Sequence, residues 1–358
     1  MTRPPGSVVP VQRNQRFDMF RILFAILVIV AHAPELSDGN RNRELWNRLT
    51  GSGETLGTVA VDGFFILSGY LIVQSWIKDP EFVNFLRKRF LRIVPGYAVA
   101  CILSTVAVGL LAPGIPSFFR HIGMPFVKSF LVLGVPGLPP VLPGLPYQVV
   151  NGSFWTLAYE FRCYLLVAVL GLCGFLRRRA FWLFTTVCLT IGTALPSITD
   201  GMSWHLRNNT FVGKPTEDFH LTASFFIGGC FYIFGDYIHF RRSFAVISGI
   251  VLISMRFISP PNLEVCLMIF GAYLMFHVAQ LPTSRFRNIG RMPDISYGIY
   301  LYGFPVESLW IFFHKGSPWI ASIVSAVVCA VLGWLSWHFV ERPMLRLKKR
   351  PTATLPSP

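Results

Sequence analysis

Charged residues are scarce in this sequence: they make up 14% of its 358 residues, against about a quarter in soluble domains. Hydrophobic residues make up 53%, and apolar runs long enough to cross a bilayer recur along the whole chain. No small-residue cleavage site follows the first run, so we expect no cleavable signal peptide. This composition excludes a soluble protein with a single anchor and predicts an all-α, polytopic integral membrane protein.

Cysteines in the spacing of a zinc site or a disulfide framework are also missing. The seven cysteines all fall inside apolar runs. We interpret them as small packing residues and expect no bound metal.

Polar breaks divide the apolar runs into ten segments, so we expect about ten transmembrane helices. The segments are 17–34, 58–77, 94–112, 153–176, 180–196, 219–238, 244–258, 263–279, 295–313 and 318–340. If the N-terminus is placed in the cytoplasm, the cytoplasmic side holds 22 Lys and Arg residues and the opposite side holds eight. Because cytoplasmic loops carry an excess of basic residues, this bias predicts that both termini are cytoplasmic.

Three parts of the chain follow from this topology. We expect a cytoplasmic N-terminal tail over 1–14, a transmembrane domain over 15–341 and a basic cytoplasmic C-terminal tail over 342–358. The basic residues behind the net charge of +15 are scattered over short loops, where they contact membrane lipids. The pattern therefore argues against nucleic acid as a partner.

Two stretches between the segments stand out. The stretch 78–97 alternates aromatic residues with a basic cluster, which is typical of an interfacial amphipathic helix. The loop 113–152 is rich in proline and glycine, and its apolar piece 124–135 is expected to dip partway into the membrane. We interpret this loop as a wall or lid for a site that faces the outside.

The first apolar segment contains two residues that lipid penalises, Arg21 and His32. They are eleven positions apart, which places them within about 20° of one helix face and about 16 Å apart along the axis. A histidine at a segment end can be a plain interfacial residue. An ionisable residue inside a span is more often functional, and here two share a face.

Further ionisable residues occur at comparable depths. Asp62 opens the second segment and Glu160 lies in the fourth, so we expect His32, Asp62 and Glu160 to meet near one level towards the outside. On the inner side, basic residues crowd the start of the third segment. With Arg21 they form a cationic cluster suited to a phosphorylated ligand, and its members are Arg87, Lys88, Arg89 and Arg92.

This pattern fits acyl transfer from coenzyme A. The cations would hold the phosphates of coenzyme A, and its thin pantetheine arm would reach between helices towards the histidine. His32 would take the proton of an acceptor hydroxyl or carry the acyl group itself, while Glu160 or Asp62 fixes its tautomer. The residues leave these two mechanisms open.

The sequence resembles the acyltransferase 3 family of integral membrane acyltransferases over about residues 14 to 347. "FDMFRILFAILVIVAH" is similar to the family's first-helix signature, with Asp18, Arg21 and His32 at its polar positions. "VDGFFILSGYLI" is similar to the second-helix signature, and "RKRFLRIVPGY" contains the Arg-x-x-Arg element at Arg89 and Arg92.

Three more motifs follow in the family's order. "SFWTLAYEFRCYLL" resembles the Trp-Thr-Leu-x-x-Glu helix with Glu160, "IGRMPDISYGIYLYGFPVE" the Ser-Tyr-x-x-Tyr-Leu segment, and "ERPMLRL" the closing Glu-Arg-Pro. One position departs from the family: Gly303 stands where many relatives have a histidine, so we assign no role there and expect that acceptor specificity differs.

The resemblance implies an enzyme that transfers acyl groups other than aminoacyl groups, in the inner membrane of a bacterial cell. It implies an acyl-CoA donor, most simply acetyl-CoA, with no permanently bound cofactor. His32 would be the essential histidine, and Arg21, Arg89 and Arg92 would serve the donor, with Lys88 beside them. The expected acceptor is a glycan or a lipid-linked oligosaccharide, and glycan-assembly proteins are expected partners.

Two other functions fit the same residues. In a proton-coupled transporter or flippase, the polar residues would form an ion relay, although we find no internal repeat of the kind that transporters show. A non-catalytic member of a glycan-assembly complex would not bind coenzyme A. The sequence leaves open the acceptor sugar, the acyl group, the oligomeric state and the role of the loop 113–152.

Overall fold

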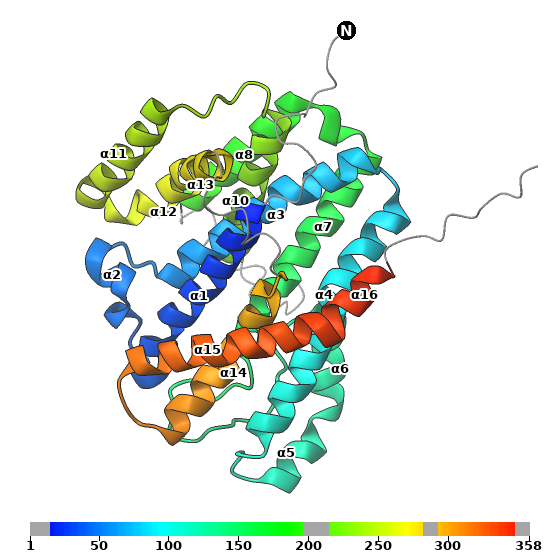
Figure 1. Ribbon diagram of the computed structural model, residues 1–358, viewed down its shortest axis with the longest axis vertical. Helices are drawn as coiled ribbons and strands as arrows, with labels where there is room; N and C mark the ends of the chain where they lie inside the picture. The colour runs from blue at the N-terminus through cyan, green and yellow to red at the C-terminus, as the bar shows by residue number, and fades with distance from the viewer. Residues whose placement is uncertain (1–14, 196–214, 282–292, 348–358) are drawn as a thin grey trace, which may run out of the picture.

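The computed structural model describes residues 15–195, 215–281 and 293–347, and every regular element within these ranges is a helix (Figure 1). The predicted N-terminal tail, 1–14, lies outside the described residues, as does most of the predicted C-terminal tail. The prediction of an all-α fold is confirmed for the described part of the chain.

Each of the ten apolar segments contains an observed helix. These are α1 (Gln15–Asp38), α3 (Leu56–Lys78), α4 (Phe82–Gly109), α7 (Trp155–Leu172), α8 (Arg179–Ala194), α10 (Pro215–Ile233), α11 (Arg242–Ile258), the stretch Leu263–Gln280, α14 (Ser296–Phe313) and the stretch Pro318–Arg346. The stretch Leu263–Gln280 consists of α12 (Leu263–Cys266), the π turn η5 (Leu267–Gly271) and α13 (Ala272–Gln280).

Six helical stretches of the described chain are long and apolar enough to cross a membrane. They are Arg16–Asp38, Leu56–Lys78, Phe82–Gly109, Gly152–Leu172, Leu263–Gln280 and Pro318–Arg346. Of the other four helices, α8 and α11 have only 16 and 17 residues, and α10 and α14 contain several polar residues. The protein is a multi-pass membrane protein, whereas ten crossings and cytoplasmic termini remain predictions.

Helix α1 packs with one face against three other helices of the bundle. It packs against α3, α14 and α15 (Pro318–Ser336), and Figure 1 shows it running between them. One face of α1 is therefore covered by protein, which is where an ionisable side chain in a span can find polar neighbours.

Helices α3 and α10 cross at unusually short range. A Cβ atom on Gly69 would lie 1.8 Å from the carbonyl oxygen of Phe225, and one on Gly228 would lie 1.9 Å from that of Ile66. Helices in membranes associate through such small residues because the two backbones can then approach closely. This contact brings the polar residues of α10 against those of α3.

Helix α4 differs from its prediction. The sequence predicted an interfacial helix over 78–97 followed by a span from 94, but one helix of 28 residues runs from Phe82 to Gly109 with Pro95 inside it. At 1.5 Å per residue it is about 42 Å long, more than the roughly 30 Å hydrocarbon layer requires. The basic cluster therefore lies on the first turns of the same helix that spans the bundle.

The loop 113–152 contains two short helices, α5 (Ile115–His121) and α6 (Gly123–Val132), which lie beside α4 at one end of the molecule (Figure 1). The phenol of Tyr97 on α4 shares its one proton between the carbonyl oxygens of Ser129 (3.1 Å) and Gly134 (2.8 Å). These bonds fix the end of α6 against the helix bundle.

The last helix continues beyond the predicted domain boundary at 341. After α15 come the π turn η7 (Trp337–Glu341) and α16 (Arg342–Arg346) without a break. The side chain of Glu341 is buried, and π turns often occur where a helix serves a functional site.

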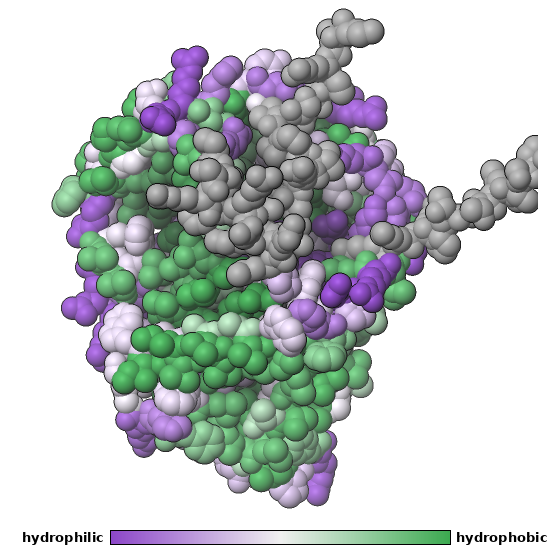
Figure 2. Space-filling model, viewed as in Figure 1, coloured by the Kyte–Doolittle hydropathy of each residue, from purple (hydrophilic) through white to green (hydrophobic). Residues whose placement is uncertain are grey.

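Hydrophobic side chains cover much of the face shown in Figure 2, including the exposed side of α15, and hydrophilic ones gather towards the rim of the view. The exposed apolar residues of α15 recur every three or four positions: Ile320, Ile323, Val327, Val331 and Trp334. An exposed apolar stripe of this kind is expected of a helix that faces lipid.

Candidate active site

Two cavities lie within the bundle and share part of their walls. The smaller has a volume of about 440 Å³ and is lined by Arg21, Arg89 and Arg92; we call it the arginine cavity. The larger has a volume of about 1230 Å³ and is lined by His32; we call it the histidine cavity. Two side chains, Val61 and Tyr300, line both, so the cavities adjoin one another.

Most charges of the arginine cavity form ion pairs. The guanidinium of Arg92 on α4 contacts Asp294 at 2.5 Å and Glu341 at 3.2 Å, and Arg21 on α1 contacts Asp294 at 3.4 Å. Asp294 precedes α14 and Glu341 lies in η7, so these ion pairs connect α1, α4, the start of α14 and η7. The structure thus brings together the arginines that the sequence placed on one side.

The side chain of Arg89 is different. Among the described residues it forms no ion pair with a carboxylate; one terminal nitrogen lies 3.3 Å from the hydroxyl of Ser75, and its buried Nε has no hydrogen-bond partner. The rings of Phe85 and Tyr164 lie 5.7 and 5.9 Å from the guanidinium. A buried cation with unused donors is costly unless an anion joins it. Arg89 is therefore placed to bind an anionic group in this cavity.

Glu160 on α7 lines the arginine cavity rather than the histidine cavity. Its carboxylate accepts hydrogen bonds from the hydroxyl of Ser68, at 3.3 Å, and from the phenol of Tyr164. Both donors belong to neighbouring turns of α3 and α7, so Glu160 is held away from His32.

Lys88 does not line either cavity. Its ammonium lies 2.5 Å from the carboxylate of Asp79, which also accepts a hydrogen bond of 2.6 Å from Asn84. Asp79 caps the end of α3 just before α4 begins, so the Lys88 side chain points towards the N-terminal end of α4. The structure gives no support for its predicted contact with the donor.

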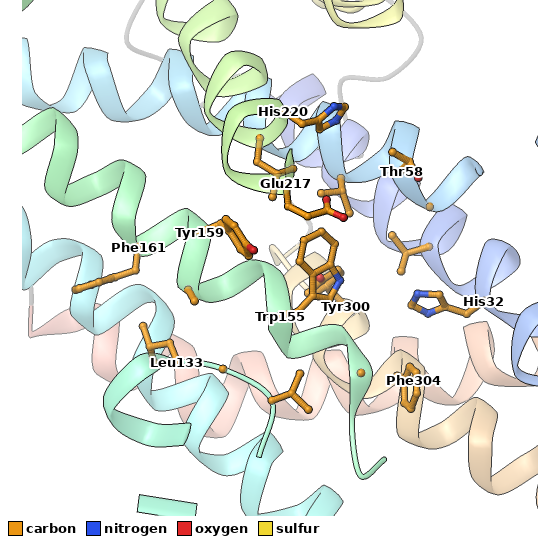
Figure 3. Close-up of a pocket in the computed structure, with 18 of the residues that line it drawn as sticks. His32, Thr58, Leu133, Trp155, Tyr159, Phe161, Glu217, His220, Tyr300 and Phe304 are labelled. Carbon is orange, nitrogen blue, oxygen red and sulfur yellow. The ribbon is translucent and has the colours of Figure 1, made fainter. Parts of the chain in front are cut away.

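The histidine cavity is rich in aromatic side chains. His32 projects from α1 towards Trp155 of α7 and Tyr300 of α14, and its ring packs edge-on to Phe304 with the centroids 5.8 Å apart (Figure 3). The Nδ1 atom of His32 is buried and has no hydrogen-bond partner among the described residues. The imidazole is thus held by packing, and no hydrogen bond to a described residue fixes its Nδ1 atom.

A second histidine of this cavity has both ring nitrogens engaged. Nε2 of His220 on α10 lies 2.5 Å from Asp62, and Nδ1 lies 3.0 Å from Glu264. Asp62 also accepts a hydrogen bond of 2.9 Å from Ser224, one turn along α10. Asp62, His220 and Ser224 are buried and Glu264 is partly exposed, and the paired group holds α3, α10 and α12 together.

These three residues also have the side-chain types of a metal site, and their nearest ligand atoms lie within 4.8 Å of one another. The two carboxylates face opposite nitrogens of one imidazole, however, so a single ion bound to either nitrogen could take only one of them as a neighbouring ligand. The geometry is that of an ion pair, and the other carboxylate would orient the ring.

The loop 113–152 forms one wall of the histidine cavity, through residues 130–135, Tyr147 and Val149. The phenol of Tyr147 donates a hydrogen bond of 2.5 Å to Glu35, which raises the pKa of Tyr147 to about 12. Glu54 lines the same cavity, and its burial together with the nearby carboxylate of Glu264 raises its pKa. The loop occupies the wall position that the sequence suggested for it.

The structure does not bring His32, Asp62 and Glu160 together. Asp62 turns towards α10, Glu160 turns towards Tyr164, and His32 contacts neither. Sequence position gives the depth of a residue along its helix but not the direction in which it points, which the neighbouring helices decide. The predicted meeting of the three side chains at one level is wrong.

Sequence reasoning missed several residues of the two cavities. His220 is an ionisable residue at the start of an apolar segment, a signal that could have singled it out. Asp294 stands two residues before the Ser-Tyr-x-x-Tyr-Leu motif, and Glu341 opens the Glu-Arg-Pro motif, yet neither position reveals that both bind Arg92.

The fold and the two cavities define a multi-pass membrane protein with a polar site enclosed by its helices. The family model described as an acyltransferase domain matches residues 14–338, nearly the whole chain. The chain therefore belongs to the acyltransferase 3 family, as its motifs suggested, and it is an acyltransferase.

Three curated relatives match along most of their length. The chain is 27% identical to an O-acetyl transferase of Shigella phage Sf6, over 93% of this chain and 96% of the relative. It is 24% identical to nodulation protein 10 of Rhizobium leguminosarum bv. viciae, over 94% of each. It is also 24% identical to the acyltransferase MdmB of Streptomyces mycarofaciens, over 85% of each. No solved structure matches the chain.

Proposed function

We propose that this acyltransferase moves an acetyl group from cytoplasmic acetyl-CoA to a hydroxyl of a glycan at the bacterial inner membrane. The acceptor would be an exopolysaccharide, a lipopolysaccharide, a lipo-oligosaccharide or a related glycan. The observation that carries the proposal is the half-buried guanidinium of Arg89, which forms no ion pair with a carboxylate in the described parts of the chain and lies in a cavity that adjoins the one containing His32.

The arginine cavity fits the charged part of the donor. The phosphates of acetyl-CoA would bind Arg89, whose unused donors suit a phosphate oxygen, with Arg21 at the same wall. Arg92 is already held by Asp294 and Glu341, so its contribution is to keep these helices in place.

The histidine cavity fits the acceptor and the chemistry. An aromatic wall of Tyr147, Trp155, Tyr159 and Phe304 can stack on sugar faces, and its few polar groups can fix their orientation. The acceptor hydroxyl would lie against His32, the lining side chain with an unused buried nitrogen.

In the direct mechanism, His32 takes the proton of the acceptor hydroxyl as its oxygen attacks the thioester carbonyl. A carbon–oxygen bond forms, the carbon–sulfur bond breaks, and the sulfur leaves and is protonated as the free thiol. In the two-step mechanism, a ring nitrogen of His32 attacks the thioester, the carbon–sulfur bond breaks, and the sulfur leaves with the ring proton as the free thiol. The hydroxyl oxygen then bonds to the acetyl carbon, the carbon–nitrogen bond breaks, and the freed ring takes the hydroxyl proton. Neither Asp62 nor Glu160 contacts His32, so its tautomer would be set by the bound acceptor rather than by these carboxylates.

The test is thiol release from acetyl-CoA by the purified protein in nanodiscs, with and without acceptor glycans. We expect the wild type to release thiol and His32→Ala to be slower by roughly 10²- to 10⁴-fold, as for loss of a general base. The matched control is His314→Ala, because His314 is exposed at the end of α14 and lines neither cavity. Undiminished turnover by His32→Ala would refute the assigned role of His32.

The two mechanisms separate in the same preparation. If labelled acetyl groups stay on the wild-type protein without acceptor and are absent from His32→Ala, the two-step mechanism holds. If label is transferred only when donor and acceptor are both present, the direct mechanism holds.

A further inference from the structure

The wall between the two cavities contains one large, firmly held side chain, Tyr300 of α14. Tyr300 and Val61 line both cavities, and the tyrosine is only 8% exposed. Any group that passes from the arginine cavity to His32 must pass these two side chains.

Hydrogen bonds and packing from two other helices fix the ring of Tyr300. Its hydroxyl donates to the carbonyl oxygen of Ser153 at 2.7 Å and lies 2.6 Å from the hydroxyl of Thr156. Since a phenol has one proton, the Thr156 hydroxyl donates the second bond. The ring also packs edge-on to Phe64, with the centroids 5.9 Å apart. Because the hydroxyl is hydrogen-bonded and the ring is packed against Phe64, the ring has little freedom to move when another group contacts it.

We propose that Tyr300 closes the pocket for the acyl group and thereby limits the donor to short acyl chains. The inference rests on the proposed function, because it places the charged end of acyl-CoA at Arg89. The thioester then lies at the shared wall, where its carbonyl can reach His32 from the side of Tyr300. The acyl chain points at the ring, which cannot move aside without losing two hydrogen bonds.

The size of the expected selectivity follows from pocket chemistry. One methylene too many in a closed apolar pocket lowers kcat/KM by roughly 10- to 200-fold. Val61 and Thr156 are smaller and leave more room, so the tyrosine ring sets the limit. An acetyl group fits such a pocket, and a butyryl group does not.

The experiment compares thiol release from acetyl-, propionyl-, butyryl- and hexanoyl-CoA by nanodisc preparations of four proteins. These are the wild type, Tyr300→Ala, Tyr300→Phe and the control Tyr302→Ala. Tyr302 is buried on the same helix but lines neither cavity. The readout is the ratio of kcat/KM for acetyl-CoA to that for butyryl-CoA, which does not depend on the fraction of protein that is folded.

We expect the wild type to favour acetyl-CoA by at least about 100-fold and Tyr300→Ala to lower this ratio by at least about tenfold. Tyr300→Phe keeps the ring and should keep most of the ratio, as should Tyr302→Ala. If Tyr300→Ala does not fold, Tyr300→Leu fills more of the space and should lower the ratio in the same direction.

An unchanged ratio in both Tyr300→Ala and Tyr300→Leu would overturn the inference and leave the proposed function standing. So would a wild type that uses hexanoyl-CoA as well as acetyl-CoA. Failure of the wild type to cleave any acyl-CoA, with or without glycan, would overturn the proposed function itself.

Discussion

The two cavities use the same kinds of residue in opposite ways. In the arginine cavity, Arg92 is saturated by two carboxylates, whereas Arg89 has none among the described residues. In the histidine cavity, His220 is paired through both nitrogens, whereas Nδ1 of His32 has no hydrogen-bond partner in the part of the chain that the structure describes. Each cavity therefore contains one residue whose ion pairs hold helices together and one of the same type without such pairs among the described residues. In the proposed function, this difference in partners, rather than residue type or depth, separates the structural residues from the ligand-binding ones.

The largest effect on folding should come from Arg92. Arg92→Ala leaves the buried carboxylate of Glu341 without a cation and weakens the contacts of Asp294. Removing one partner of a buried pair lowers the free energy of unfolding by about 3–5 kcal/mol. The measurement is the thermal unfolding midpoint in detergent without ligand.

The control for Arg92 is Arg87→Ala on the same helix. Arg87 is exposed and donates one hydrogen bond to a backbone carbonyl, so its loss should cost within about 0.5 kcal/mol. Equal unfolding midpoints for the two variants would show that the ion pairs of Arg92 do not hold the helices.

The next effect should be on donor binding through Arg89. Arg89→Ala removes charge-assisted hydrogen bonds to phosphate worth about 1.5–3 kcal/mol, which weakens acetyl-CoA binding by roughly 10- to 150-fold. Its unfolding midpoint should fall far less than that of Arg92→Ala, because Arg89 forms no ion pair with a carboxylate among the residues that the structure describes. Calorimetric titration of coenzyme A in nanodiscs measures the affinity, and wild-type affinity in Arg89→Ala would refute the assigned role.

A somewhat smaller effect is expected from His220. His220→Ala leaves Asp62 and Glu264 without their shared donor, which costs about 1–3 kcal/mol of unfolding free energy. Coenzyme A affinity should stay close to that of the wild type, because His220 does not line the arginine cavity. If His220→Ala is as stable as the wild type but binds coenzyme A weakly, His220 has a role in donor binding and not in holding the helices together.

The smallest effect should come from Lys88. Lys88→Ala breaks a partly exposed ion pair with Asp79, which is worth about 0–1 kcal/mol. Its coenzyme A titration should match that of the wild type and so serves as the neighbouring control for Arg89→Ala. A loss of affinity as large as that of Arg89→Ala would return Lys88 to the donor site.

Sequence alone located the helices well, because apolar runs between polar breaks are a strong signal in membrane proteins. All ten segments contain a helix, and the six motifs identified the family that the comparisons confirm. The continuity of α4 was missed because a basic, aromatic stretch has the same pattern at an interface as at the end of a long span.

The candidate site was predicted less completely. Arg21, Arg89 and Arg92 were expected to cluster, and they line one cavity. The partners of Asp62 and Glu160 were not foreseeable, because they come from α10 and from Tyr164, and pairing between helices depends on how each is rotated. The close approach of α3 and α10 at Gly69 and Gly228 sets that rotation. The sequence does not reveal which glycines face a neighbouring helix, so this contact could not be predicted.

The most direct measurement is a cryo-electron microscopy structure of the protein in nanodiscs with coenzyme A. The division between the two cavities predicts phosphate density at Arg89 and a pantetheine arm that ends beside Tyr300, with the histidine cavity left for the acceptor. Phosphate density in the histidine cavity, or at Lys88 outside both cavities, would contradict it.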